Sequence, residues 1–233
     1  MMSSIEGLSP HAAAIFEGVS RLNSIKEYVL MGGTALALQL RHRLSEDLDF
    51  CKWHKKGEKI AVNWPEVEQE LATLGEVKKD LLSMSQCDFY VSGVKITFLA
   101  DNNFTAPSCL RRQLFLNNLA IIDLITIGAM KLDVMSRRNA YRDFYDFYAI
   151  LKSGVALDDL IANAGLYTRH TLRTKDMVSM LLSVAELSIP QDFDRLNPIY
   201  RVTPQEIQRY MIEKVQIFLK NTGREKKFSI KER

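Results

Sequence analysis

Long apolar segments are missing from this chain of 233 residues, and their absence excludes the membrane-spanning proteins. No stretch offers the roughly 20 consecutive apolar residues that a transmembrane helix needs. Cysteine is also scarce, because Cys51, Cys87 and Cys109 are far apart in the sequence and odd in number. This argues against a disulfide framework and fits a reducing compartment, so we expect a cytoplasmic protein with no membrane partner.

Histidine is equally sparse, and its four residues are scattered, so a zinc cluster is not expected. Cys51 and His54 are close together, but a packed thiol beside a surface imidazole is the simpler interpretation. A strong charge imbalance is absent as well. The net charge of +3 is too small to indicate a nucleic-acid partner by itself.

Three clusters of basic residues say slightly more than the net charge. Each alone is most simply a solvated surface. If all three lined one cleft, they would hold a polyanion such as RNA. The clusters are Lys52, Lys55, Lys56 and Lys59; Arg111 and Arg112; and Arg137, Arg138 and Arg142.

The pattern of apolar residues divides the chain into an α/β front half and an all-helical rear half. A hydrophobic fraction of 47% is ordinary for a globular protein, and a chain of this length buries a large core without disulfides. Ser9-Pro10 predicts the start of a helix that continues through 12–26, and Asn63-Trp64-Pro65 opens a second helix to about Leu74. The predicted strands are 28–31, 47–51, 76–84, 87–91, 94–99 and 113–121.

The rear half is predicted to be helical from Asp123 to about Lys220, with breaks near Gly154, Gly165, Pro190 and Pro198. No linker rich in glycine, serine or proline separates the halves. We therefore expect an α/β core over 1–121, a helical domain over 122–223 packed tightly against it, and a site in the crevice between them. The charged tail 224–233 is expected to be frayed.

The most informative segment begins with Gly32 and Gly33, directly after the β-prone run 28–31. We expect a strand, a glycine turn and a helix capped by Thr34. Two residues without Cβ atoms let the backbone approach a ligand closely, and the start of a helix favours an anion such as a triphosphate. Alone this evidence is weak, because two glycines before a helix are also ordinary turn chemistry.

A pair of carboxylates follows the glycine pair after about a dozen residues. On a strand, Asp47 and Asp49 face one way while Leu48 and Phe50 face the core. Their Cα atoms are then roughly 7 Å apart, so two like charges need a cation or solvent between them. An isolated Asp-x-Asp is more simply a polar strand face, but the nearby glycine pair favours divalent-metal and nucleotide chemistry.

Residues 32–50, GGTALALQLRHRLSEDLDF, closely resemble the first motif of the AbiEii-type nucleotidyltransferase toxins, members of the polymerase-β-like nucleotidyltransferase superfamily. The resemblance extends more loosely over 123–151. It implies an α+β fold, with a polymerase-β-like mixed sheet and flanking helices followed by an all-helical C-terminal half. It also implies nucleotide binding by Gly32, Gly33, Thr34 and Ser45, with Arg43 in support.

The family's second motif is a lysine followed two residues later by the third carboxylate of the metal site. The resemblance places Lys95 at the nucleotide, but Thr97 stands at the carboxylate position. A neutral hydroxyl is a poor substitute for a carboxylate as a metal ligand. Asp101, expected just beyond the strand, could replace the missing carboxylate. Otherwise the protein binds one metal tightly and takes the second with the nucleotide, or it has lost activity.

Lys131 lies within an apolar stripe of the expected helix 123–138, where an inward-facing ammonium needs a partner. The alternative is a lysine that reaches out to solvent. The resemblance favours the first interpretation, since this residue matches the family's third-motif lysine and so implies a role at the nucleotide phosphates. Asp133 and Arg137 are expected to form an ordinary surface pair.

Another helix begins at Tyr141, and Asp143 and Asp146 share one of its faces. The resemblance assigns Asp146 to the fourth motif, where it would orient the acceptor or Lys131, with Asp143 in support. Arg142 is four residues before Asp146 and offers the alternative of simple charge neutralisation. The core stripe of this helix is predicted to consist of Phe144, Phe147, Tyr148 and Leu151.

These patterns together predict a metal-dependent nucleotidyltransferase. Asp47 and Asp49 would bind Mg²⁺ or Mn²⁺, Lys131 would neutralise developing phosphate charge, and an acceptor hydroxyl would attack the α-phosphate of a nucleoside triphosphate (NTP). The resemblance implies a toxin with a cognate antitoxin protein and an RNA acceptor such as transfer RNA. Two competing interpretations remain: a glycosyltransferase with an Asp-x-Asp site, and a non-catalytic nucleotide- or partner-binding domain.

Overall fold

Seven strands form one mixed sheet in the computed structural model, which describes residues 5–54, 60–105, 110–167 and 172–223. The strand order is β3-β4-β5-β2-β1-β7-β6. Strand β2 runs antiparallel to β1 and parallel to β5, while β1 runs parallel to β7. The strands are β1 (Val29–Met31), β2 (Leu48–His54), β3 (Val77–Leu82), β4 (Gln86–Val91), β5 (Val94–Thr105), β6 (Arg112–Leu116) and β7 (Leu119–Ile122).

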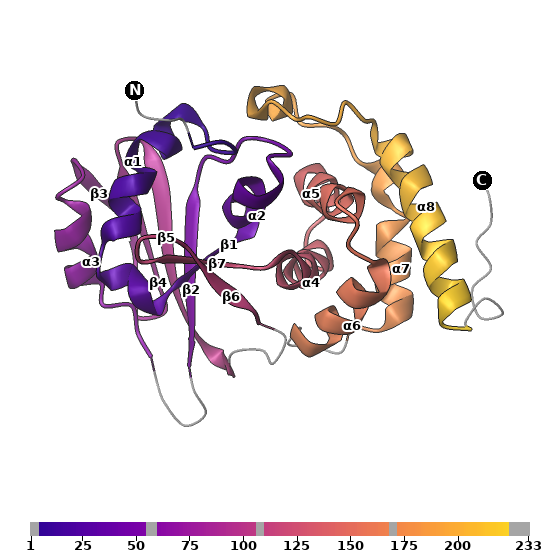
Figure 1. Ribbon diagram of the computed structural model, residues 1–233, viewed down its shortest axis with the longest axis horizontal. Helices are drawn as coiled ribbons and strands as arrows, with labels where there is room; N and C mark the ends of the chain where they lie inside the picture. The colour runs from indigo at the N-terminus through magenta and orange to yellow at the C-terminus, as the bar shows by residue number, and fades with distance from the viewer. Residues whose placement is uncertain (1–4, 55–59, 106–109, 168–171, 224–233) are drawn as a thin grey trace.

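Helices cover both faces of the sheet and build the rear half of the chain (Figure 1). Helices α1 and α3 lie on one face, α2 and α4 lie on the other, and α5 to α8 continue away from the sheet. The helices are α1 (Pro10–Arg21), α2 (Gly32–Leu40), α3 (Trp64–Leu71), α4 (Leu124–Met135), α5 (Tyr141–Lys152), α6 (Leu157–Tyr167), α7 (Thr174–Leu181) and α8 (Pro204–Asn221). Short 3₁₀ turns occupy Ser24–Glu27, Val184–Glu186 and Phe193–Leu196.

Alternation along β2 separates the core from the functional face of the sheet. Leu48 and Phe50 are buried, and the Phe50 ring stacks on Phe98 of β5 with 5.2 Å between centroids. Tyr28 adds an edge contact to the same Phe98 ring. Because successive strand residues point to opposite faces, Asp49 points away from this aromatic cluster toward α2. The predicted alternation of carboxylates with core residues is confirmed.

The mixed sheet and the helical rear half confirm the predicted fold class. A single hydrophobic cluster runs from Phe16 in α1 through Phe50 and Leu132 to Val215 in α8. The two halves are therefore joined by a continuous core, as the missing linker predicted. The sheet ends at Ile122, close to the expected boundary; the division into two domains at residues 121 and 122 stays a prediction.

The strand predicted over 113–121 is wrong, because the structure has a hairpin there. Asn117 adopts φ 50°, a left-handed conformation that asparagine tolerates in turns, and it separates β6 from β7. Asn118 then donates its side-chain amide to the carbonyls of Arg21 and Leu22. The turn is thus tied to the end of α1, a contact that local periodicity does not reveal.

Two further element boundaries differ from the prediction. The first helix begins at Pro10, with the Ser9 hydroxyl as its cap, but ends at Arg21 instead of continuing to Lys26. Gly165 does not break a helix, because it lies inside α6. The predicted tail 224–233 and Lys55, Lys56, Lys59 and Cys109 fall outside the described residues.

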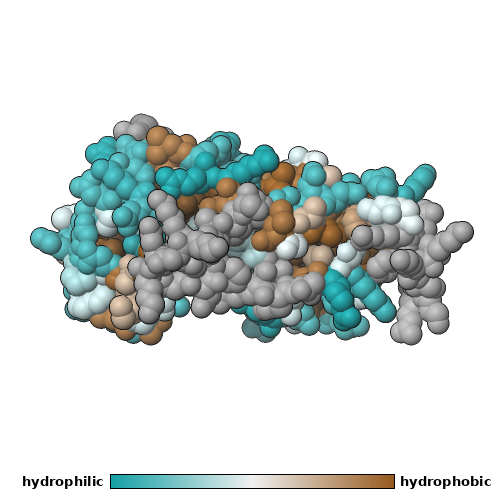
Figure 2. Space-filling view, turned by 90° about the horizontal axis from the view of Figure 1, so that it is seen from below, coloured by the Kyte–Doolittle hydropathy of each residue, from teal (hydrophilic) through white to brown (hydrophobic). Residues whose placement is uncertain are grey.

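The aromatic stripe of α5 forms the core predicted for it. Phe144, Phe147, Tyr148 and Leu151 are buried. Within the described part of the chain, no helix has both the length and the apolar character that crossing a membrane requires. Hydrophobic residues do reach the surface toward the middle of the long axis on the face drawn in Figure 2.

Candidate functional site

The glycine pair begins α2 directly after β1, and it makes room for two charged side chains. Gly32 has φ +69°, and a Cβ atom built on it would lie 3.2 Å from Asp49 Oδ2. A Cβ on Gly33 would lie 2.7 Å from Arg43 Nη2, closer than real Cβ contacts allow. The structure therefore explains both glycines by the approach of a carboxylate and a guanidinium to the start of the helix.

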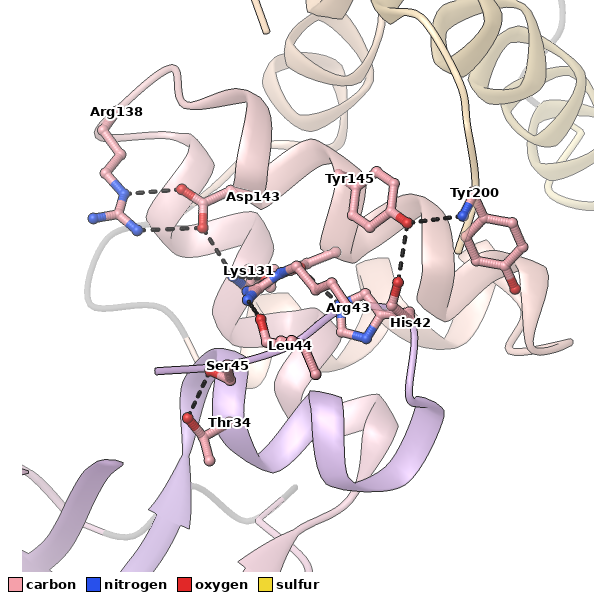
Figure 3. Close-up of polar contacts among 11 residues, drawn as sticks. Thr34, His42, Arg43, Leu44, Ser45, Lys131, Arg138, Asp143, Tyr145 and Tyr200 are labelled. Carbon is pink, nitrogen blue, oxygen red and sulfur yellow. Dashed lines mark hydrogen bonds and ion pairs between the residues drawn. The ribbon is translucent and has the colours of Figure 1, made fainter. Parts of the chain in front are cut away.

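Thr34 does not cap the helix, which corrects the prediction. It is the third residue of α2 and 2% exposed. Its hydroxyl donates to the carbonyl oxygen of Asp47, and Ser45 Oγ lies 2.8 Å from Thr34 Oγ1 (Figure 3). Because the one Thr34 proton goes to the carbonyl, Ser45 is the donor in the second bond. These two hydroxyls fix the chain immediately before the carboxylate pair.

The two carboxylates at the start of β2 are held in an environment that disfavours their charge. Asp47 is exposed, whereas Asp49 is largely covered. Burial and then the neighbouring Asp47 raise the pKa of Asp49, and burial followed by Glu46 raises the pKa of Asp47. A dication between them would relieve this repulsion, and carboxylate oxygens are the ligands that Mg²⁺ prefers. The donor chemistry of the pair therefore fits a divalent metal.

A third carboxylate does not stand beside the pair in the expected place. Thr97 lies directly opposite Asp49 in the parallel pairing of β2 and β5, and its hydroxyl opposes the rise in the pKa of Asp49. Asp101 belongs to β5 itself, four residues further along, and so does not replace it. No group of three or more His, Cys, Asp or Glu side chains in the described ranges is arranged to hold a metal ion.

Asp146 is the centre of a buried ion network that joins the two halves of the chain. Arg43 Nε lies 2.7 Å from its Oδ1 and Arg43 Nη2 lies 2.8 Å from its Oδ2, a bidentate pair. Lys131 Nζ lies 2.6 Å from Oδ2. Burial alone would raise the pKa of Asp146, but the charges of Arg43 and Lys131 and a bond from His42 hold it well below its usual range.

Asp143 binds the other side of Lys131 (Figure 3). Lys131 Nζ lies 2.8 Å from Asp143 Oδ1, and Arg138 Nε donates to Asp143 Oδ2 over 2.9 Å. The side chain of Lys131 is only 9% exposed, so the predicted inward-facing ammonium has two carboxylate partners. Burial opposes ionisation of Asp143, but Lys131 and Arg138 lower its pKa.

Two expected charge pairs differ from the structure. Arg142 does not neutralise Asp146, whose partners are Arg43, Lys131 and His42; its charge instead favours ionisation of Asp47. Asp133 does pair with Arg137, but Asp133 is 7% exposed and so is not a surface residue. The i,i+4 spacing predicted the pair but not the burial of its acidic member.

His42 is a member of the network that the sequence did not single out. Its Nε2 lies 2.8 Å from Asp146 Oδ1, and its ring stacks on Tyr145. Tyr145 donates to the His42 carbonyl and accepts from the backbone N–H of Tyr200. The imidazole is fully buried, so burial lowers the pKa of His42 despite its bond to Asp146. No local pattern marks this residue, because its partner is 104 positions away.

A cavity of about 320 Å³ lies further along the same sheet face, and neither Asp47 nor Asp49 lines it. Cys51 and Leu99 line it, each two residues beyond Asp49 and Thr97 on their strands. Helix α4 supplies the opposite wall through Met130 and Val134. The sheet and the helical half thus enclose a cavity, but none of the predicted catalytic residues lines it, and a site in the crevice between the halves stays a prediction. Cys51 is buried, as expected of a packed thiol.

Comparison with known proteins identifies the segment that holds the glycine and Asp pairs. Residues 14–84 match the family described as nucleotidyl transferase AbiEii toxin, type IV TA system. The chain is also 25% identical over 211 residues to the uncharacterized protein aq_aa25 of Aquifex aeolicus (strain VF5), which covers 88% of this chain and 94% of that protein.

Two solved structures from Helicobacter pylori have the same fold along nearly the whole chain. JHP933 has a TM-score of 0.50 at 18% identity, over 94% of this chain and 96% of its own. A structure described as "putative nucleotidyltransferase" has a TM-score of 0.54 at 17% identity, over 95% and 100%. The resemblance drawn from residues 32–50 is thus confirmed: residues 14–84 match the AbiEii nucleotidyl transferase toxin family, and the chain shares its fold with the structure described as a putative nucleotidyltransferase.

Proposed function

We propose that this protein is a metal-dependent nucleotidyltransferase that moves a nucleoside monophosphate from an NTP to an acceptor hydroxyl. The hydroxyl oxygen forms a bond to the α-phosphorus, and the bond from that phosphorus to the bridging oxygen breaks. Pyrophosphate leaves with those electrons, and the hydroxyl proton passes to solvent. Such reactions depend mainly on positioning and on electrostatic stabilisation of phosphate charge.

The observation that carries the proposal is the approach of Asp49 to the first residue of α2. Gly32 has φ +69°, and a Cβ atom there would crowd the Asp49 carboxylate at 3.2 Å from Oδ2; the ionisation of Asp49 is itself disfavoured by burial and by Asp47. The Asp49 carboxylate, which we propose binds a cation, thus lies beside the backbone N–H groups that begin a helix, and these favour anions. A nucleotide phosphate carried with a dication matches both features.

Asp47 and Asp49 would hold Mg²⁺ or Mn²⁺. When bound, such an ion would neutralise charge on the phosphates and promote attack by the hydroxyl. Two protein carboxylates are enough for this ion, because Mg²⁺ commonly keeps waters and takes its remaining oxygens from substrate phosphates. The absence of a three-residue acidic cluster among the described residues agrees with a metal that arrives with its nucleotide.

The triphosphate would be held mainly by backbone groups. The hydroxyls of Thr34 and Ser45 hydrogen-bond to each other, and Thr34 also donates to the Asp47 carbonyl. Gly33 and Thr34 would therefore bind the triphosphate through their backbone N–H groups. Lys95 is about one-third exposed and offers an ammonium on the same sheet face. Lys131 would stabilise the phosphates through its positive charge and not by direct contact, because its ammonium is already bonded to Asp143 and Asp146.

The proposal is tested by following a label from the α-phosphate of each NTP into total RNA in the presence of Mg²⁺. We expect transfer by the wild-type chain and none by Asp47→Ala or Asp49→Ala. Label transfer to RNA that persists in both variants would contradict the mechanism. Metal-dependent NTP binding without transfer would favour a non-catalytic nucleotide-binding domain, the alternative that Thr97 motivates.

We further propose that the acceptor is RNA, such as transfer RNA, and that the chain acts as a toxin neutralised by a cognate antitoxin. The matching family is a toxin of a type IV toxin-antitoxin system, which implies an antitoxin partner. Induction of the chain should slow growth, and its genomic neighbour should restore growth. Toxicity that persists in Asp49→Ala would separate the biological role from the chemistry proposed here.

A further inference from the structure

Asp88 is a buried carboxylate that the proposed reaction does not use. It is 4% exposed and lies in β4, next to β5. The strand registers place Asp88 opposite Thr97 and Thr97 opposite Asp49, so the three residues form one row across three strands. Directly opposite residues have Cβ atoms about 4.5 to 5.5 Å apart. A second buried acid therefore lies two strands from Asp49 on the same face.

Lys95 has two carboxylates near it on this face, Asp47 and Asp88. Continuing the register of β2 and β5 by one residue places Asp47 opposite Lys95. The ammonium nevertheless turns to the diagonal neighbour, with Nζ 2.8 Å from Asp88 Oδ2. In the part of the chain that the structure describes, Lys95 makes its ion pair with Asp88 and none with Asp47.

We propose that Asp88 is a positioning residue, which holds Lys95 away from Asp47 and so keeps the Asp47 and Asp49 carboxylates open to a divalent cation. The inference rests on the proposed function, since it concerns the same metal site. If Asp88 lost its charge, the Lys95 ammonium would be released to turn to Asp47, which lies opposite Lys95 in the continued strand register. A bound ammonium there would occupy the place of the dication and oppose it electrostatically.

The surroundings of Asp88 suit this role better than that of a metal ligand. Oδ2 is taken by Lys95, and Oδ1 accepts from Gln86 Nε2 over 3.1 Å. Burial opposes ionisation of Asp88, but bonds from Lys95, Gln86 and Thr97 lower its pKa. Asp88 is therefore ionised and already satisfied at neutral pH.

The same row accounts for a neutral residue at position 97. Asp49 and Asp88 flank Thr97, and the hydroxyl interacts with both of them. A hydroxyl carries one proton and two acceptor lone pairs, so it donates to one carboxylate at a time. A carboxylate at position 97 would instead place three like charges side by side. Threonine at position 97 adds no negative charge beside Asp88, and the Asp88 carboxylate is needed to hold the Lys95 ammonium.

The test measures binding of Mn²⁺ alone to the full chain by the electron paramagnetic resonance signal of free Mn²⁺. We expect Asp88→Asn to weaken Mn²⁺ binding by about tenfold or more, the usual scale for residues that orient a metal site. The double variant Asp88→Asn/Lys95→Gln should recover the affinity of Lys95→Gln. Asp80→Asn, on exposed β3, is the matched control, because it removes a nearby charge that is not bonded to Lys95.

Unchanged Mn²⁺ binding in Asp88→Asn would overturn the inference. Weaker binding that Lys95→Gln does not rescue would also overturn it, because Asp88 would then act on the metal directly. Lys95→Gln alone leaves buried Asp88 in place, and it should bind Mn²⁺ at least as tightly as wild type; weaker binding contradicts the inference even if Asp88→Asn fails to fold. Failure of the proposed function is seen separately, as wild-type Mn²⁺ binding that Asp49→Ala leaves unchanged.

Discussion

Asp146 shows how much a single buried carboxylate depends on its partners. It is fully buried, and Arg43, Lys131 and His42 all bond to it. Replacing one member of such a network leaves the others charged and unpaired in the interior, which costs more than an exposed ion pair gains. The network therefore holds the loop before β2 against α4 and α5.

Asp146→Asn should lower the free energy of unfolding by about 3 to 5 kcal/mol, because Arg43 and Lys131 lose their shared counter-charge. Asp194→Asn is the control, since the Asp194 pair with Arg201 is exposed and should change stability by at most about 1 kcal/mol. Urea unfolding at neutral pH measures both variants. Equal losses in the two variants would contradict a stabilising network.

His42 gives a second prediction at this scale. Its folded pKa is lowered, first by burial, so the unfolded state binds the proton first as pH falls. Stability should therefore decrease as pH falls below about 6.5, the unperturbed value, until the folded imidazole also protonates. Urea unfolding between about pH 7.5 and about pH 5.5, on either side of that value, should show this slope in wild type and a smaller slope in His42→Gln. An identical slope in both chains would disprove the assignment.

Asp49 is expected to lower stability in the absence of a cation. Its folded pKa is raised by burial and by Asp47, so the folded state binds the proton more tightly and stability is lost as pH rises through that window. Asp49→Asn should raise the melting temperature at neutral pH and abolish any rise caused by Mg²⁺. A lower melting temperature for Asp49→Asn without metal would contradict this account.

At the scale of elements, the first residues of α2 are glycines because a Cβ atom there would crowd neighbouring side chains. A Cβ on Gly33 would press on Arg43 Nη2, and that guanidinium is held by Asp146. Gly33→Ala should therefore cost about 1 to 3 kcal/mol, as overpacking does elsewhere. Gly165→Ala should stabilise by about 0.5 to 1 kcal/mol, because Gly165 lies in α6 with open space around it.

Thermal or urea unfolding of the two alanine variants provides the comparison, since both introduce the same methyl group into a helix. Opposite signs are expected. Destabilisation by Gly165→Ala of the same size as that by Gly33→Ala would show that the space at Gly33 is not the reason for that glycine.

Local patterns predicted the parts of the site that lie within one element. The alternation around Asp49 and the apolar stripe around Lys131 are both properties of a single strand or helix, and both were confirmed. The hairpin at Asn117 was missed because an asparagine turn without glycine carries little sequence signal. Its contact with the end of α1 requires the tertiary fold.

Pairings between distant segments were beyond sequence reasoning. Arg43 and Asp146 are 103 residues apart, and nothing in either local pattern names the other. The sequence showed Thr97 where a carboxylate was expected, but it did not connect Asp88 with Thr97. That connection depends on the register of β4 and β5, which single-sequence patterns leave open.

At the scale of the whole molecule, the site lies where the sheet meets the helical half. Asp47 and Asp49 come from β2 and the segment before it, whereas Lys131 and Asp146 come from α4 and α5. Arg43 joins the two sets through its bidentate bond to Asp146. A continuous hydrophobic core then keeps the two halves in one arrangement. Nucleotidyl transfer is therefore expected to be a property of the assembled chain and not of residues 14–84 alone.

The most direct measurement compares an NTP labelled at its α-phosphate with the same NTP labelled at its γ-phosphate, each incubated with total RNA, Mg²⁺ and the full chain. Nucleotidyl transfer predicts that the α label enters the RNA while the γ label leaves as pyrophosphate, and that Asp49→Ala abolishes both events. Incorporation of the γ label, or equal α-label incorporation by wild type and Asp49→Ala, would contradict the account.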